Sequence, residues 1–302
     1  MKSNLETKEG TRSRYEERAR FLSVEDGFNI SRQQLSAHAF VAQRERAFSR
    51  TTPTELIALD QSEVLGTPWP ATTPIMLARY IRVRAEEGLE CNFVCGGAIH
   101  VVLEGRGKWF AARDQFAWEK GDIFIVPGGV DSTYGAATDS VLYCVTNEPL
   151  YSFEAIPVGS SQQVAPVLYP AAAIALQIDG LARRSLGPET PGRALNLSSD
   201  CLAKERTALR SLTGSFNLVL PGESQRPHKH SAAALVLVLQ AGGCHSTIGG
   251  RRVDWQPDVV LLTPPLEHHT HRNDGVEAAL AFIVQDGALH YYTRTMGFAF
   301  TD

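Results

Sequence analysis

Three histidines in this chain have the spacing of a metal site. His228 and His230 are separated by one residue, and His269 follows the apolar run Val259 to Leu262. In a β-strand the side chains at positions i and i+2 lie on the same face, so the first two imidazoles would point to one interior position. A facing strand would bring the third imidazole to the same point. Because imidazole nitrogens bind transition metals, the pattern predicts a metal site.

The strands that must hold these histidines are recognisable as short apolar runs. Ala232 to Leu239 follows the histidine pair, and turn signals such as Gly249-Gly250 separate this run from the next one. Short runs of β-branched and other apolar residues between turns predict hairpins. Apolar residues at helical spacing predict two N-terminal helices and one later helix. The expected helices cover residues 12–22, 31–50 and 171–184.

The same features occur earlier in the chain. Leu103 to Gly107 resembles Leu239 to Gly243, and Gly121 to Gly129 resembles Asp258 to Leu266. Such an internal repeat predicts two similar units, separated by about 136 residues. The histidine positions project onto Asn92, Val94 and Ser132, and Asn273 projects onto Ala136. The first copy of the repeat is therefore expected to keep the strands and lack the ligands, with His100 as a hydrogen-bonded core histidine.

Composition excludes several classes of protein. The chain has 302 residues, of which 43% are hydrophobic, enough for roughly two domains of about 150 residues each. A net charge of -4 and a pI near 6.2 provide no basic stripe for nucleic acid. The apolar runs are shorter than the about 20 residues that cross a bilayer. Residues 1–20 do not have the pattern of a signal peptide. These features predict a cytoplasmic protein without nucleic-acid or membrane partners.

The histidine motifs resemble those of the cupin superfamily. The first cupin motif is a glycine, five residues and His-x-His, which here runs from Gly222 to His230. The second motif is matched by Pro264, His269 and Asn273. Two positions depart from it. Ala234 and Leu235 stand where a cupin carboxylate is expected, and Leu266 replaces the motif glycine.

In lacking this carboxylate, the chain is similar to the gentisate, salicylate and hydroxynaphthoate ring-cleaving dioxygenases, which hold iron by three histidines. The resemblance includes Pro221-Gly222-Glu223, Ser231 to Leu235, His269 to Asn273 and, upstream, Pro68 to Pro74. It implies a mainly β fold of two cupin barrels (double-stranded β-helix, or jelly-roll) with N-terminal helices. The expected parts are an N-terminal segment (1–75), a degenerate barrel without metal (76–154), a linker with a short helix (155–205) and a metal-binding barrel (206–302).

The resemblance also implies a set of site residues. His228, His230 and His269 would bind the metal, His271 and Asn217 would be catalytic, and Arg193, Val236 and Asn273 would contact the substrate. Val236 replaces a carboxylate-binding arginine of these dioxygenases, and Arg193 is the candidate to compensate for it. His271 would transfer a proton or orient the substrate. The alternative is that Leu266 alters the turn, so that Glu267 faces the pocket instead.

The implied activity is Fe(II)-dependent cleavage of a hydroxylated aromatic ring by dioxygen, although Mn, Zn and Ni also suit histidine ligands. Two alternatives stay open. One is a metal-dependent hydrolase, lyase or isomerase similar to ureidoglycine aminohydrolase, and the other is a non-catalytic cupin that binds a small molecule. The cupin resemblance further implies a homodimer or homotetramer.

Overall fold

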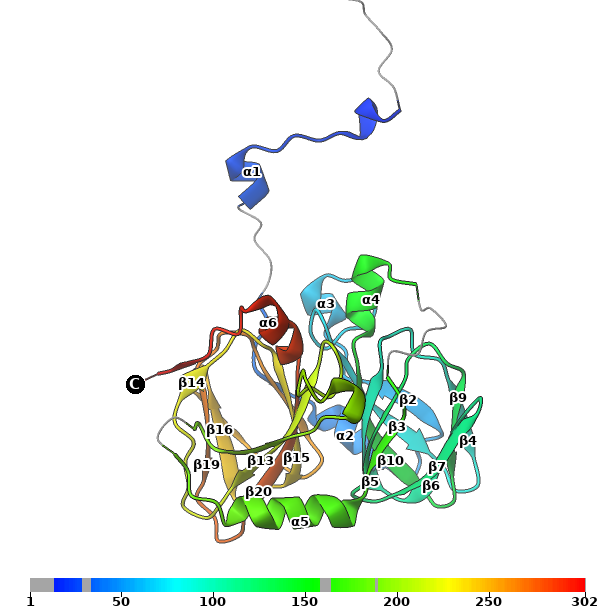
Figure 1. Cartoon of the computed structure of the whole chain (residues 1–302), viewed down its shortest axis with the longest axis vertical. Coiled ribbons are helices and arrows are strands. Elements are labelled where there is room, and N and C mark those ends of the chain that lie inside the picture. Colours follow the sequence, from blue (N-terminus) through cyan, green and yellow to red (C-terminus); the bar gives the residue numbers. More distant parts are fainter. Residues whose placement is uncertain (1–13, 29–33, 158–163, 188–189, 302) are drawn as a thin grey trace, which may run out of the picture. The chain divides into compact units, whose positions relative to one another are not determined.

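The computed structural model describes residues 14–28, 34–157, 164–187 and 190–301 (Figure 1). It divides into two units, Met1–Gln33 and Gln34–Asp302. In the first unit the described residues form a 3₁₀ turn at Glu16–Arg18 and the helix α1 at Val24–Phe28. The helix expected over residues 12–22 is therefore wrong where the chain is described. Phe21 there is 96% exposed, so no packing surface stabilises a longer helix.

The second unit contains two sandwiches, and each sandwich consists of two antiparallel sheets. In one of them the two sheets differ in size. The larger sheet has the strand order β11 (Val167–Tyr169), β8 (Ile123–Val126), β5 (Ala98–Glu104), β10 (Ser140–Thr146), β3 (Leu77–Val83) and β2 (Glu55–Ala58). The smaller sheet has the order β4 (Gly88–Cys91), β9 (Ser132–Ala136), β6 (Arg106–Ala111) and β7 (Asp114–Glu119). We call this pair of sheets the first sandwich.

The second sandwich repeats this plan. Its larger sheet has the order β1 (His38–Ala39), β18 (Val260–Thr263), β15 (Ala234–Gln240), β20 (Ala279–Gln285), β13 (Thr213–Val219) and β12 (Arg193–Asn196). Its smaller sheet has the order β17 (Arg251–Asp254), β16 (Cys244–Ile248), β19 (His269–Asn273), β14 (His228–Lys229) and β21 (Ala299–Phe300). The predicted metal ligands therefore belong to the smaller sheet.

The two larger sheets pack against each other, and this arrangement explains their composition. Leu235 and Leu237 of β15 lie in the core between the two sandwiches, whereas Ala234, Val236 and Val238 of the same strand face the interior of the second sandwich. A strand buried on both faces has a continuous apolar sequence instead of an alternating one. Strand β19, in the smaller sheet, alternates between buried and partly exposed residues.

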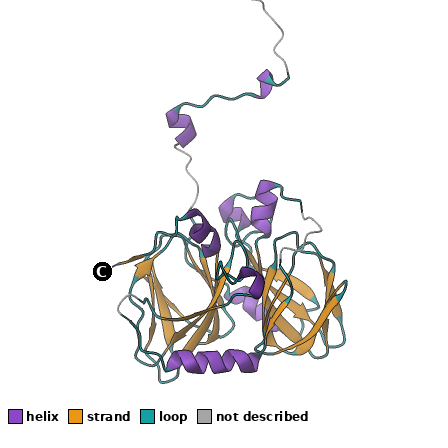
Figure 2. Cartoon of the chain, viewed as in Figure 1, coloured by secondary structure: helices purple, strands orange, loops and turns teal. Residues whose placement is uncertain are grey.

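The helices of the second unit lie at the ends of the two sandwiches and between them, and one of them runs across both sandwiches at one end (Figure 2). They are α2 (Val41–Phe48), α3 (Ser62–Leu65), α4 (Glu148–Glu154), α5 (Ala171–Ala182), α6 (Gly287–Thr293) and the 3₁₀ turn η2 (Asp200–Leu202). Helix α5 forms where the sequence predicts a helix near residues 171–184. The helix expected over residues 31–50 is shorter, since residues 38–39 pair with β18 as strand β1; residues 31–33 lie outside the described part.

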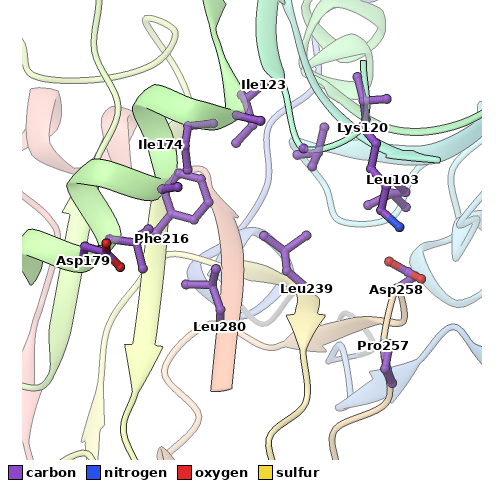
Figure 3. Close-up of a pocket in the computed structure, with 16 residues that line it drawn as sticks. Leu103, Lys120, Ile123, Ile174, Asp179, Phe216, Leu239, Pro257, Asp258 and Leu280 are labelled. Carbon is purple, nitrogen blue, oxygen red and sulfur yellow. The ribbon is translucent and has the colours of Figure 1, made fainter. Parts of the chain in front are cut away.

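A cavity of about 540 Å³ lies between the two larger sheets, and α5 forms one of its walls (Figure 3). Its walls are largely apolar, with Ile174 of α5 facing Phe216, Leu239 and Leu280 of the second sandwich. None of the predicted site residues lines it. Within the described residues, no helix combines the length and the apolar character needed to span a membrane.

Candidate metal centre

The structure brings the three predicted ligands together. His228 lies directly opposite His269 in the pairing of β14 with β19, and His230 follows β14 on the same face as His228. One ligand nitrogen from each of the three lies within 4.8 Å of the others. The side chains are buried, with exposed fractions of 7% for His228, 5% for His230 and 5% for His269. A single ion could thus bind all three imidazoles after small rotations of their side chains.

The backbone fixes the tautomer of each of these histidines. The Nδ1 atoms lie 2.8 Å from the carbonyl oxygens of Arg226, Ala232 and Glu267, respectively. A carbonyl oxygen only accepts hydrogen bonds, so each Nδ1 must carry the proton. The three Nε2 atoms therefore keep free lone pairs. This is the state in which an imidazole binds a metal through Nε2.

Burial also keeps these imidazoles neutral. Desolvation lowers the pKa of His228, that of His230 to about 4 and that of His269 to about 2. Hydrogen bonds to the backbone act in the opposite direction but are outweighed. Neutral, buried imidazoles with fixed tautomers are the donor set of a transition-metal site, so the residues present fit the metal implied by the sequence.

The turn before His269 contains a strained residue. Leu266, at the position of the motif glycine, has a φ of 61°, a left-handed conformation that costs a side-chain-bearing residue about 1–2 kcal/mol. Its backbone N–H donates to the carbonyl of His230 over 2.7 Å. This bond ties the turn to the strand of the histidine pair and explains why the conformation is kept.

We expect Leu266→Gly to raise the free energy of unfolding by about 0.5–1 kcal/mol, because relief of the left-handed strain outweighs the greater freedom of glycine in the unfolded chain. Leu266 is 58% exposed, so the substitution removes little packing. Urea denaturation would measure the change. Leu266→Ala keeps a Cβ in the left-handed region and should show no such gain; equal stability of all three proteins would contradict this explanation.

His271 lies beside the triad and is held by two other side chains. Its Nδ1 is 2.8 Å from the hydroxyl of Ser246, which accepts a hydrogen bond of 2.8 Å from Nε1 of Trp255. Because Trp255 only donates, the Ser246 hydroxyl proton is free to go to Nδ1 of His271. The hydrogen bonds from Trp255 to Ser246 and from Ser246 to His271 therefore favour the tautomer of His271 with the proton on Nε2. Burial lowers the pKa of His271 to about 3. The carboxylate of Glu267, the alternative group, lies beside Gly249 at the hairpin turn.

The structure does not bring Arg193 to the histidines. Arg193 pairs with Leu218 at the edge of the larger sheet, and its guanidinium forms an ion pair with Glu223 over 2.8 Å. It also donates to the carbonyl of Leu181. Burial would raise the pKa of Glu223, but hydrogen bonds from Arg193 and from the backbone hold it below its usual range. Arg193 thus anchors the loop that precedes the histidine pair and is already fully engaged.

The predicted catalytic residue Asn217 and the predicted substrate residues Val236 and Asn273 lie within the second sandwich and have structural partners. Asn217, on the strand β13, accepts a hydrogen bond from the side chain of Gln225. The side-chain amide of Asn273 donates to the carbonyls of Val219 and Glu277, and its oxygen accepts from a backbone N–H. Val236 is 2% exposed and belongs to the interior core. Asn273 therefore serves to close the turn after β19.

The first sandwich keeps the frame of the site without its ligands. Cys91 pairs with Ser132 in β4 and β9 as His228 pairs with His269 in β14 and β19. The residue two positions after Cys91, the counterpart of His230, is Phe93. A thiol, a phenyl ring and a hydroxyl thus occupy the three positions, and all of them are buried.

This register corrects the projection made from the sequence. Asn92 and Val94, the projected counterparts of the histidine pair, are exposed, since the true offset differs by one residue and reverses the face of the strand. His100 is a core histidine as predicted. It stacks on Phe124 at 4.4 Å between ring centroids and lies 2.9 Å from the hydroxyl of Tyr134.

Several residues around the four histidines were not predicted from the sequence. Ser246 and Trp255 orient His271, and Phe298 lies over His228 with a ring-centroid distance of 5.3 Å. Phe298 precedes β21, which pairs with β14. The repeat offers a signal for Trp255, because Trp118 precedes Gly121 in the first sandwich much as Trp255 precedes Asp258. No motif marks Ser246 or Phe298.

Comparison with known proteins agrees with this geometry. Residues 217–285 match the family model described as a cupin domain. The gentisate 1,2 dioxygenase 1 of Aquipseudomonas alcaligenes is 35% identical over 86 residues, which are 28% of this chain and 25% of that protein. The gentisate 1,2-dioxygenase of a Ralstonia species is 28% identical over 133 residues, 44% of this chain and 35% of that protein. The matched stretches thus span about a third or less of these relatives' length.

A likeness to solved structures extends over most of the chain. A salicylate 1,2-dioxygenase from Pseudaminobacter salicylatoxidans superposes with a TM-score of 0.73 at 12% identity, covering 93% of this chain and 92% of that one. At this identity the likeness concerns the fold. The prediction of a mainly β cupin fold is confirmed.

Proposed function

We propose that this gentisate dioxygenase-like cupin uses dioxygen to open the ring of a hydroxylated aromatic compound, with Fe(II) held by His228, His230 and His269. The observation that carries the proposal is a set of three buried histidines that each offer one ligand nitrogen within 4.8 Å of the others, with backbone contacts at Nδ1 that leave Nε2 unprotonated. A ferrous ion bound there would supply coordination of phenolic oxygens and the redox chemistry of dioxygen. The named relatives are dioxygenases of gentisate, which supports an aromatic substrate.

The residues around the triad have distinct tasks in this proposal. The apolar interior of the second sandwich, which includes Val236 and Leu261, excludes water from the reacting ring. His271 presents an N–H from Nε2 and donates it to a substrate oxygen, which orients the ring and stabilises negative charge on that oxygen. Asn217 holds the side chain of Gln225, whose backbone N–H donates to the carbonyl of His271.

The substrate should not depend on a carboxylate. Val236 offers no charge, and Arg193 is committed to Glu223. A carboxylate buried without a partner costs a few kcal/mol. We therefore expect kcat/KM to be at least about tenfold higher for catechol- or hydroquinone-like compounds than for their carboxylated counterparts. Oxygen consumption by the iron-loaded protein with both sets of compounds would measure the ratio.

Arg193→Gln is the control for this expectation. It should lower stability, because Glu223 loses its ion-pair partner, and leave the ratio between the two sets of compounds unchanged. A strict preference for carboxylated compounds that disappears in Arg193→Gln would contradict the assignment and show that Arg193 reaches the substrate.

The identity of the ion is part of the proposal, because Mn, Zn and Ni bind histidine sites as well. Metal analysis of the native protein would settle it, and oxygen uptake restored by Fe(II) alone is the expected result. The homodimer or homotetramer and the cytoplasmic location stay predictions from the sequence.

A further inference from the structure

Gln285 reaches the triad from the larger sheet. It is the last residue of β20, where Ala281 and Ile283 at alternate positions face the interior of the second sandwich. Its side-chain amide lies 3.4 Å from Nε2 of His230. No motif in the sequence marks this residue, and it stands on a different sheet from the three histidines.

The contact involves the nitrogen that would bind a metal. Nδ1 of His230 donates to the carbonyl of Ala232, so Nε2 has a free lone pair that accepts from the amide of Gln285. An ion on that nitrogen would take the lone pair. A half-turn of the Gln285 amide then exchanges its NH2 group for its carbonyl oxygen at the same place. The carbonyl oxygen would face the ion.

The distance is that of two ligands on one ion. Ligand atoms that each lie about 2.1 Å from an ion are about 3.0 Å apart at an octahedral angle and about 3.4 Å apart at a tetrahedral angle. The separation of 3.4 Å between the Gln285 amide and Nε2 of His230 lies in this range. The distance between Gln285 and His230 therefore fits two ligands of the same ion.

The neighbouring residues leave this space to Gln285 and hold its backbone in place. Ala234 lies directly opposite in β15, and its methyl group cannot reach the histidines. On the other side Gln285 pairs with Thr213 of β13. The next residue, Asp286, accepts a hydrogen bond of 2.9 Å from the backbone N–H of Ala233, shortly after His230 in the chain. Gln285 is thus tied to the same segment as its histidine neighbour.

We propose that Gln285 is a fourth protein ligand, which binds the ion of the histidine triad through its side-chain carbonyl oxygen. This inference rests on the metal site of the proposed function. A fourth protein ligand reduces the positions open to other molecules from three to two at an octahedral ion. A substrate that binds through two oxygens would then fill the site unless Gln285 leaves it, so Gln285 controls access to the ion.

Cobalt binding tests this proposal without an activity assay. Gln285→Leu and Gln285→Met remove the carbonyl oxygen, and Gln285→Glu keeps one. The dissociation constant for Co²⁺, from competition with a chelator, should rise by about 10- to 100-fold in the first two variants and stay within a few-fold of the parent in Gln285→Glu. The visible absorption of bound Co²⁺ should change in the first two variants. Gln240→Leu, the same substitution at the exposed end of β15, is the matched control.

The outcomes separate this inference from the proposed function. Circular dichroism first identifies which variants are folded, and the more flexible Met serves if Leu disrupts the strand. Unchanged affinity and absorption in a folded Gln285 variant would overturn the fourth ligand, even if His228→Ala abolishes binding. Unchanged Co²⁺ binding in His228→Ala would overturn the metal site and this inference together. Weaker Co²⁺ binding in both His228→Ala and a folded Gln285→Leu or Gln285→Met protein would support Gln285 as a ligand. If the parent protein then oxidises no phenol, ring cleavage is refuted.

Discussion

His228→Ala is expected to abolish stoichiometric metal binding. The three imidazoles each offer one ligand nitrogen within 4.8 Å of the others, so removal of His228 leaves two of the three imidazoles and a gap beside Phe298. Loss of a hydrogen-bond partner behind a ligand commonly weakens metal binding by about 10- to 100-fold, and loss of a ligand itself should exceed this. Metal analysis after dialysis against a weak chelator would measure the occupancy.

His268→Ala is the matched control for this substitution. His268 is adjacent to His269 but exposed, and the alternation of the strand directs it away from the triad. It should keep full occupancy. Full occupancy in His228→Ala as well would show that the ion binds elsewhere, and the assignment of all three histidines would then fail.

The convergence of the three histidines could be predicted from the sequence because the geometry that brings two of them to one face is local. The i, i+2 spacing of His228 and His230 determines that both face the same way, and the same rule puts His271 beside His269. Both residues of β19 are buried, whereas Thr270 between them is not fully buried. Strand periodicity therefore sufficed for the four histidines once the strands were recognised.

Contacts between distant segments could not be predicted in this way. Arg193 was the candidate to compensate for the arginine that Val236 replaces, but its partner Glu223 depends on how β12 pairs with β13. Strand β1 interrupts an expected helix because it pairs with β18, more than two hundred positions later in the chain. Local propensity contains no information on such partners.

The first sandwich shows how sensitive strand faces are to register. A shift of one residue in the projected repeat moved the counterparts of the histidine pair from Cys91 and Phe93 to Asn92 and Val94, on the opposite face. Because that half lacks the two histidine motifs, no signal in its sequence determined the register. The pairing of Cys91 with Ser132 supplied it.

His271→Ala is expected to keep the metal and to lower the rate of oxygen uptake by about 10²- to 10⁴-fold, the usual contribution of a positioned proton donor. The imidazole is 3% exposed and is held by Ser246, yet it is not among the three groups that meet at the metal position. Single-turnover rates and metal content would be measured on the same samples, with a phenol that the parent protein oxidises.

Two further variants separate orientation from a mere loss of packing. Ser246→Ala removes the hydroxyl that favours the Nε2–H tautomer and should lower kcat by about tenfold with little change in KM, whereas Ser246→Thr keeps the hydroxyl and should restore the rate. Glu267→Gln should leave the rate unchanged, because that carboxylate lies beside Gly249. If Glu267→Gln slows the reaction and His271→Ala does not, the proton donor is Glu267, and the turn at Leu266 must rearrange when substrate binds.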